Sequence, residues 1–151
     1  NIGPFMKRVI TAIAFAFILG IAQVGFSEEI KSEVIELKEL QTKIKLVISD
    51  QINAFTRSDL DRAYYHASKS IKLIFPNPEI FGSMVKTSYP MIWAPKAYQF
   101  LSVSQLPNGV VQKVMFTASD GRMHFFDYVL ENNGRRWVIS GVYMVKGEEG
   151  V

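Results

Sequence analysis

Residues 96–145 read KAYQFLSVSQLPNGVVQKVMFTASDGRMHFFDYVLENNGRRWVISGVYMV, and this stretch decides the fold. Apolar and polar residues alternate along it in four runs, which is the period of a β-strand. The breaks between the runs carry Asn108-Gly109, Asp120-Gly121 and Asn133-Gly134. Such pairs are typical of two-residue type I′ hairpin turns. The stretch therefore predicts four antiparallel strands joined by short turns.

Two-residue turns also predict a register, because the residues that flank each turn must face one another. Glu131 is then opposite Arg136, and Leu130 is opposite Trp137. One predicted face carries Tyr98, Phe100, Ser102, Ser104, Lys113, Met115, His124, Phe126, Tyr128, Trp137, Ile139 and Tyr143. The other carries Leu101, Val103, Val114, Phe116, Phe125, Asp127, Val129, Val138 and Val142. Since both faces are too apolar to be exposed to water, we expect helices over one face and either a second copy of the chain or the remaining helix over the other. A homodimer is the expectation that we favour.

The first half of the chain predicts helices. Apolar residues recur every three or four positions from Ile30 to Phe55, which indicates one long amphipathic helix. Ser58 is expected to cap a short helix that runs through Leu60 to Ala67. Asn77-Pro78 predicts a third helix, which Tyr89-Pro90 ends. The fold class is therefore α+β, with N-terminal helices packed on a four-stranded antiparallel sheet.

The N-terminal residues predict an export signal. Met6-Lys7-Arg8 precede the uncharged run from Val9 to Phe26, and Gly25 and Ser27 have the −3 and −1 spacing of a cleavage site. Residues 1–27 would then be removed, residues 28–146 would form one domain, and residues 147–151 would be a frayed tail. We expect a periplasmic or secreted protein without membrane attachment after cleavage. The alternative is an uncleaved anchor helix, because the run approaches the length that spans a bilayer.

Composition excludes several classes of function. Without Lys7 and Arg8, fifteen of the seventeen cations remain against fourteen acids, a net charge of +1. This near balance argues against nucleic-acid binding, which needs a basic face. The chain has no Cys, so thiol catalysis and thiolate metal sites are excluded. His66 and His124 lack any ligand spacing motif and no glycine-rich phosphate loop is present, so we expect no metal and no cofactor.

Three segments carry a resemblance to a known family. They are Gln51-x-x-Ala54-Phe55-x-x-x-Asp59-x-x-x-Ala63-Tyr64-x-x-Ala67-Ser68, then Phe81-x-x-Met84-Val85-x-x-x-Tyr89-Pro90, and Trp137-Val138-Ile139-x-Gly141-Val142. The chain resembles an exported bacterial family known as domain of unknown function 4864, which is similar to the nuclear transport factor 2-like superfamily. That resemblance implies a curved sheet wrapped around helices as a cone. Because the superfamily contains isomerases, dehydratases, ligand binders and assembly modules, it selects no function.

The predicted register gathers candidate site residues. His124 is opposite Tyr143, Lys113 is opposite Tyr128, and the candidates on that face also include Tyr98 and Trp137. With Tyr64 from the second helix, and Ser104 and Lys113 near the mouth, these residues predict a pocket for a small apolar or amphipathic ligand. Binding of a protein partner is the alternative for a non-catalytic domain. Other interpretations are a core imidazole bonded to a tyrosine, an isomerase or dehydratase that uses His124 and tyrosines, and a purely structural dimerisation module. We expect a structural role for Asp127, beside Ser140 or at a dimer seam, and a solvent-facing His66.

Overall fold

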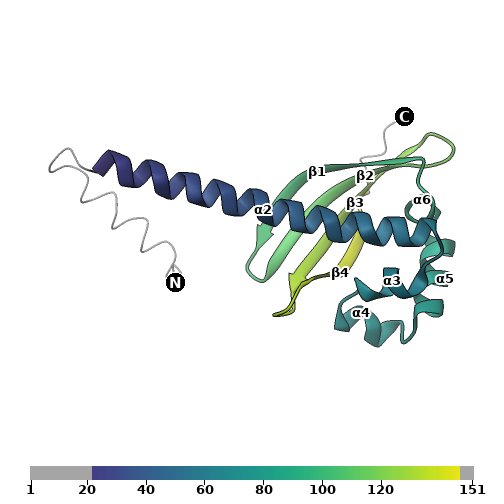
Figure 1. Cartoon of the computed structure of the whole chain (residues 1–151). Coiled ribbons are helices and arrows are strands. Elements are labelled where there is room, and N and C mark those ends of the chain that lie inside the picture. Colours follow the sequence, from purple (N-terminus) through teal and green to yellow (C-terminus); the bar gives the residue numbers. More distant parts are fainter. Residues whose placement is uncertain (1–21, 147–151) are drawn as a thin grey trace. The chain divides into compact units, whose positions relative to one another are not determined.

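Five helices precede a four-stranded sheet in the computed structural model, which describes residues 22–146 (Figure 1). The helices are α2 (Ala22–Thr56), α3 (Leu60–Tyr65), α4 (Lys69–Ile74), α5 (Pro78–Ser88) and α6 (Pro90–Trp93). The strands are β1 (Ala97–Leu106), β2 (Gly109–Thr117), β3 (Met123–Asn132) and β4 (Trp137–Met144), in the order β1-β2-β3-β4. This architecture confirms the predicted α+β class. Most of the predicted signal and the predicted tail lie outside the described residues.

Helix α2 belongs to two structural units. Its residues up to Glu39 belong to the first unit, and Leu40 begins a compact unit that contains every other helix and strand described. Within the compact unit the predicted apolar stripe is buried, with Ile44 and Ile48 fully inaccessible. Farther toward the N-terminus the same stripe is exposed, since Ile30 is 46% accessible. Among residues 22–146, no helix combines the length and apolar character needed to cross a membrane.

Side-chain caps set where the short helices begin. Asn77 Oδ1 accepts a hydrogen bond from the amide of Ile80, and Pro78 opens α5, as predicted. The cap of α3 is Asp59, whose side chain accepts from Arg62 N, and not Ser58 as we predicted. Ser58 has φ of 59°, which places it in the turn that separates α2 from α3. Helix α4, capped by Ser68, was not predicted.

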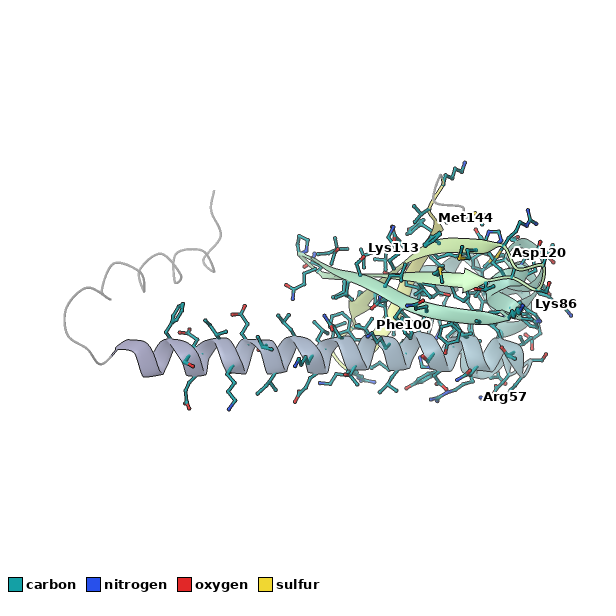
Figure 2. The ribbon with its side chains drawn as sticks, turned by 90° about the horizontal axis from the view of Figure 1, so that it is seen from above. Arg57, Lys86, Phe100, Lys113, Asp120 and Met144 are labelled. Carbon is teal, nitrogen blue, oxygen red and sulfur yellow. The ribbon has the colours of Figure 1, made fainter. Side chains whose placement is uncertain are left out.

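The sheet has one buried face. Buried and half-buried residues alternate strictly along β2 and along most of β3. The inner face carries Val114, Phe116, Phe126 and Tyr128, all fully inaccessible, and it packs with the compact-unit part of α2 and with α5 and α6 in one core. Figure 2 shows Phe100 on the side of the sheet that faces α2, and Lys113 on the other side. The outer face is only half-buried along its centre.

None of the three turns is the predicted two-residue type I′ turn. Such a turn needs positive φ at both central residues, and within the described residues only Ser58, Gly121 and Gly134 have positive φ. The first hairpin pairs Leu106 with Gly109, so its turn is Pro107-Asn108. The second loop spans 118–122 and the third spans 133–136, where Asn133 Oδ1 accepts from two following amides. The Asn-Gly and Asp-Gly pairs mark the loops correctly, but the first turn lies one residue earlier than predicted and the other two loops are longer than two residues.

The different loops change the register, so the predicted faces are partly wrong. Asn132 is opposite Trp137, and Glu131 is opposite Val138 instead of Arg136. Lys113 is opposite Asp127 on the outer face, not opposite Tyr128. The same corrections move Ser104 and Met115 to the outer face, and Val103, Val114, Phe116 and Val142 to the inner face.

The new register also moves Tyr143 to the other face of the sheet. A bulge between Val129 and Leu130 shifts the β3–β4 pairing by one residue. Tyr143 therefore lies opposite Asp127, on the face away from His124. A one-residue shift turns every following side chain to the other face of the sheet, which is why the predicted His124–Tyr143 pair does not form.

Candidate functional site

A cavity of about 270 Å³ lies between the helices and β4, and we call it the tyrosine pocket. The end of α2, helices α4, α5 and α6, and strands β3 and β4 all contribute to its walls. Most of its lining is apolar, and includes Phe55, Ile71, Ile74, Phe81, Ile139 and Val142. The amphipathic spacing of the helices explains this lining, because each helix turns its apolar side toward the same core.

Gln51 and Tyr128 are the deeply buried polar residues of the tyrosine pocket. Gln51 is 3% exposed, and its Nε2 donates to the carbonyl of Ala63 at 3.1 Å. Tyr128 is fully buried, and its hydroxyl has no hydrogen-bond partner among the described protein atoms. Burial, with a smaller contribution from Tyr98, raises the pKa of Tyr128 above its usual value of 10.0. The phenol is therefore a neutral hydroxyl in apolar surroundings.

The mouth of the tyrosine pocket is at the sheet edge. Tyr143 is 61% exposed, and its ring covers the space that a side chain on Gly141 would need. Ile74 on α4 is 69% exposed although it also lines the cavity. Tyr143 and Ile74 therefore give the cavity exposed side chains on two of its walls, whereas Tyr128 lies fully buried inside.

The structure brings together only part of the predicted site. Tyr128 and Tyr143 both line the tyrosine pocket, although they reach it from opposite faces of β3 and β4. His124 is 9% exposed, lies opposite Phe116, and lines neither of the two cavities described here. Tyr98 is on the inner face beside Phe116, with 6.0 Å between ring centroids, and it too is outside both cavities.

The remaining predicted residues have other contacts. The hydroxyl of Tyr64 donates a hydrogen bond to the carbonyl oxygen of Phe75 at 2.6 Å, so Tyr64 stabilises the loop between α4 and α5. Lys113 Nζ lies 3.8 Å from Asp127 Oδ1 on the outer face. The predicted contact of Asp127 with Ser140 does not form, because Ser140 donates its hydrogen bond to the carbonyl oxygen of Val129 and Asp127 contacts Lys113. Gln51, Phe81 and Ile139 were not predicted as pocket residues, although all three lie in the segments that resemble the family.

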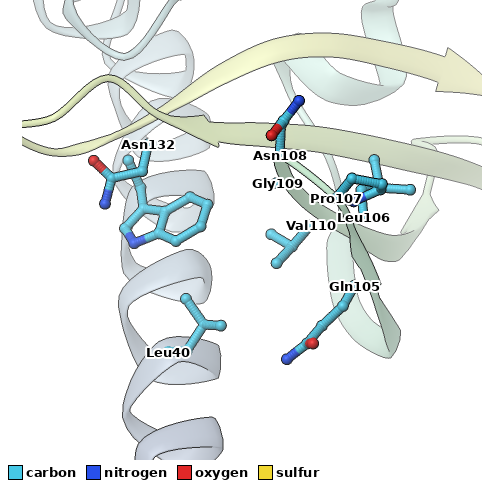
Figure 3. Close-up of a pocket in the computed structure, with 9 residues that line it drawn as sticks. Leu40, Gln105, Leu106, Pro107, Asn108, Gly109, Val110 and Asn132 are labelled. Carbon is cyan, nitrogen blue, oxygen red and sulfur yellow. The ribbon is translucent and has the colours of Figure 1, made fainter. Parts of the chain in front are cut away.

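Trp137 lines a second hollow, the hairpin groove, shown in Figure 3. This groove has a volume of about 380 Å³ and lies between Leu40 on α2 and the β1–β2 turn at Pro107 and Asn108. Its polar lining consists of exposed turn and strand-end residues such as Gln105 and Asn132. Because it offers no buried polar group, it is a weaker candidate for a ligand site than the tyrosine pocket.

A charged cluster at α3 was missed by the sequence analysis. Asp50 Oδ2 lies 2.6 Å from both Arg62 Nε and His66 Nε2, and His66 is only 5% exposed. The prediction that His66 faces solvent was wrong. The chain after α3 packs against β4, where the carbonyl oxygen of His66 accepts a hydrogen bond from the amide of Ile139. In residues 22–146, no three His, Asp or Glu side chains gather as a metal site requires.

The chain is thus an α+β domain in which helices cover one face of an antiparallel four-stranded meander. A family model described as Domain of unknown function (DUF4864) matches residues 37–150. The chain belongs to this family, which confirms that part of the resemblance. The match begins close to Leu40, where the compact unit begins. No curated protein matches the sequence.

Proposed function

We propose that this domain is a non-catalytic binding module that holds a small apolar or amphipathic ligand in the tyrosine pocket. One observation carries the proposal: the hydroxyl of Tyr128 is fully buried beside an apolar cavity and has no hydrogen-bond partner in residues 22–146. An unpaired buried hydroxyl costs about 1–3 kcal/mol, so a ligand that accepts from it recovers that free energy. The apolar lining would supply the remaining affinity.

The size of the cavity limits the ligand. An engineered apolar cavity of about 150 Å³ holds benzene, and drug-sized ligands occupy about 300 Å³ or more. A volume of about 270 Å³ therefore suits a single substituted ring or a medium-length acyl chain. A carbonyl or carboxyl oxygen on this ligand would accept the hydrogen bond from Tyr128.

Export and the cone-shaped fold belong to the same proposal. The basic residues, apolar run and small residues around Ser27 support export to the periplasm or medium. N-terminal sequencing of protein recovered from that compartment should begin within a few residues of Glu28, and a chain that still carries Met6 would contradict cleavage. The helices on one face of the sheet, with a cavity between the layers, are compatible with a nuclear transport factor 2-like cone.

An isomerase or dehydratase is the weaker candidate. An enzyme of this kind would need His124 and tyrosines in one cavity, but His124 does not line the tyrosine pocket. We therefore assign no catalytic role to His124. His124→Ala should leave ligand binding intact, whereas our sequence interpretation predicted that it would loosen binding.

A thermal-shift and NMR titration with octanoate and benzoate tests the binding proposal. Val142→Phe fills the tyrosine pocket, and Val34→Phe makes the same change at an exposed position of α2 that does not line the pocket, as the matched control. We expect wild type and Val34→Phe to be stabilised by a probe and Val142→Phe to be unaffected. Binding that survives in Val142→Phe, or no response of wild type to either probe, would refute the proposal.

A further inference from the structure

Two cations, one on α4 and one in the loop between β3 and β4, act on one another through their charges. Lys72 and Arg136, which we call the α4 cation pair, have no acidic side chain within 4.0 Å among the described residues. Burial and then the charge of Arg136 lower the pKa of the Lys72 amine. Of the nearby charges, Asp50 is already bonded to Arg62 and His66. The pair therefore lacks a compensating anion.

Arg136 is held in a fixed position with part of its guanidinium unused. Its Nη2 donates to the carbonyl of Tyr65 at 2.6 Å, and its guanidinium carbon lies 3.6 Å from the centre of the Tyr65 ring. Its Nη1 is buried and has no acceptor. A guanidinium stays protonated, and its forked donors match the oxygens of a phosphate or carboxylate. Because Tyr65 already orients the group, little conformational entropy is lost when an oxyanion binds.

Helix α4 places an exposed apolar side chain next to these cations. Lys69, Lys72 and Leu73 have i, i+3 and i+4 spacing, so they share one face of the helix. Leu73 is 77% exposed, and Ile74 at the mouth of the tyrosine pocket is 69% exposed. Cations beside exposed aliphatic side chains are the composition of a surface that binds anionic lipid, because headgroup and acyl region are then contacted together.

We propose that Lys72 and Arg136 bind the phosphate of an anionic phospholipid, with Leu73 entering the acyl region, so that α4 docks on a lipid surface. The phosphate compensates the charge of both cations and relieves the repulsion between them. The inference does not depend on a ligand in the tyrosine pocket, although a lipid surface at Ile74 would deliver an amphipathic ligand to the pocket mouth.

The absence of cysteine makes a local test possible in the full chain. Leu73→Cys labelled with an environment-sensitive fluorophore should shift to the blue with phosphatidylglycerol vesicles and not with phosphatidylcholine vesicles. The same label at Ser119→Cys, an exposed loop position, should not respond. Because the label is on α4, its signal reports contact of this surface with the vesicle and not contact of another part of the chain. Equal responses at the two positions would overturn the proposal.

Charge variants in the labelled protein identify the site. Lys72→Gln and Arg136→Gln should each weaken vesicle binding about fivefold, the effect of one cation near an anionic surface. Lys86→Gln is the matched control, because Lys86 lies over the Trp93 ring at 5.5 Å as Lys72 lies over Tyr64 at 4.9 Å. If Arg136→Gln fails to fold, Lys72→Gln still decides the question. An equal loss in Lys86→Gln would mean nonspecific attraction and would refute the site.

Two further variants and one further probe separate the lipid site from the tyrosine pocket and from a site for free phosphate. Val142→Phe, which blocks the tyrosine pocket, should bind vesicles as wild type does, so failure of the pocket proposal leaves this one standing. Inorganic phosphate that binds wild type but not Arg136→Gln, together with no blue shift on vesicles, would overturn phospholipid as the source of the anion. Loss of vesicle binding in Leu73→Ser, measured with the label at Ser70→Cys, would support insertion of this side chain.

Discussion

The carboxylate of Asp50 and the imidazole of His66 form a short contact of 2.6 Å between α2 and the end of α3. Because an ionised carboxylate only accepts, Nε2 of neutral His66 must carry the proton, and Nδ1 is left as a buried acceptor without a partner. Burial lowers the pKa of His66 and outweighs the nearby Asp50. For Asp50, partial burial acts to raise the pKa, but hydrogen bonds from His66 and Arg62 lower it overall.

Removing the anion and removing a cation beside His66 should move its pKa in opposite directions. Asp50→Asn removes the charge that favours imidazolium, so the pKa of His66 should fall further. Arg62→Gln removes a cation that disfavours imidazolium, so the pKa should rise. A titration followed by NMR of the imidazole nitrogens measures both. Shifts of the same sign in the two variants would contradict this assignment of causes.

The same pKa predicts how stability depends on pH. The folded-state pKa of His66 is below the unfolded value of 6.5, so the unfolded chain binds more protons in the window between the two values. Stability that is complete above pH 6.5 should therefore be lost as pH falls through that window, and Asp50 should add a further loss below pH 3.8. Urea unfolding from pH 7.5 to 5 should show a weaker slope in His66→Asn than in wild type.

Two tyrosine-to-phenylalanine changes should have opposite effects on stability. Tyr128→Phe removes a buried hydroxyl without a partner, so the free energy of unfolding of the unliganded domain should rise by up to about 1 kcal/mol. Tyr64→Phe removes the 2.6 Å bond to Phe75 O and should cost about 1 kcal/mol. Urea denaturation compares the two. A loss of stability in Tyr128→Phe would mean that its hydroxyl already has a partner, such as a bound water.

Local signals in the sequence predicted α2, α3, α5 and the four strands, but not α4 or α6, and they did not determine how the strands pair. The cap at Asn77 and the stop at Tyr89-Pro90 act within one turn of helix, so they could be read directly. The face of Tyr143 depends on a bulge at Val129, and loop length depends on the sign of φ, which an Asn-Gly pair does not determine. His66 is buried by β4, far away in sequence. Tyr128 was therefore predictable as a pocket residue, and the Asp50 cluster was not.

Gly109 tests the corrected hairpin. In the structure it ends the turn beside β3, where a Cβ would overlap the carbonyl oxygen of Leu130. Gly109→Asn should therefore cost about 1–3 kcal/mol, whereas a type I′ turn at Asn108-Gly109 would tolerate Asn. Gly121→Asn is the comparison, because Gly121 has φ of 86° and open space around it, so the change adds backbone strain without a clash and should cost less, about 1 kcal/mol. Equal effects measured by urea unfolding would contradict the register.

Our expectation of a homodimer places a second copy of this chain on the outer face of the sheet. Along it, the ion pair of Lys113 and Asp127 is flanked on one side by Val111 and Val129, and on the other by Met115 and Phe125. A two-fold axis at the ion pair would bring opposite charges and apolar pairs together reciprocally, as an isologous dimer requires.

We therefore expect a dimer in sedimentation velocity at micromolar concentration, which Val129→Arg should dissociate, because a charge would be buried against the partner's apolar side chains. Leu46→Arg is the matched control, since Leu46 is 64% exposed on α2 and away from the sheet face. It should remain a dimer. A monomeric wild type would refute the interface, and dissociation by Leu46→Arg but not by Val129→Arg would move it to the helix.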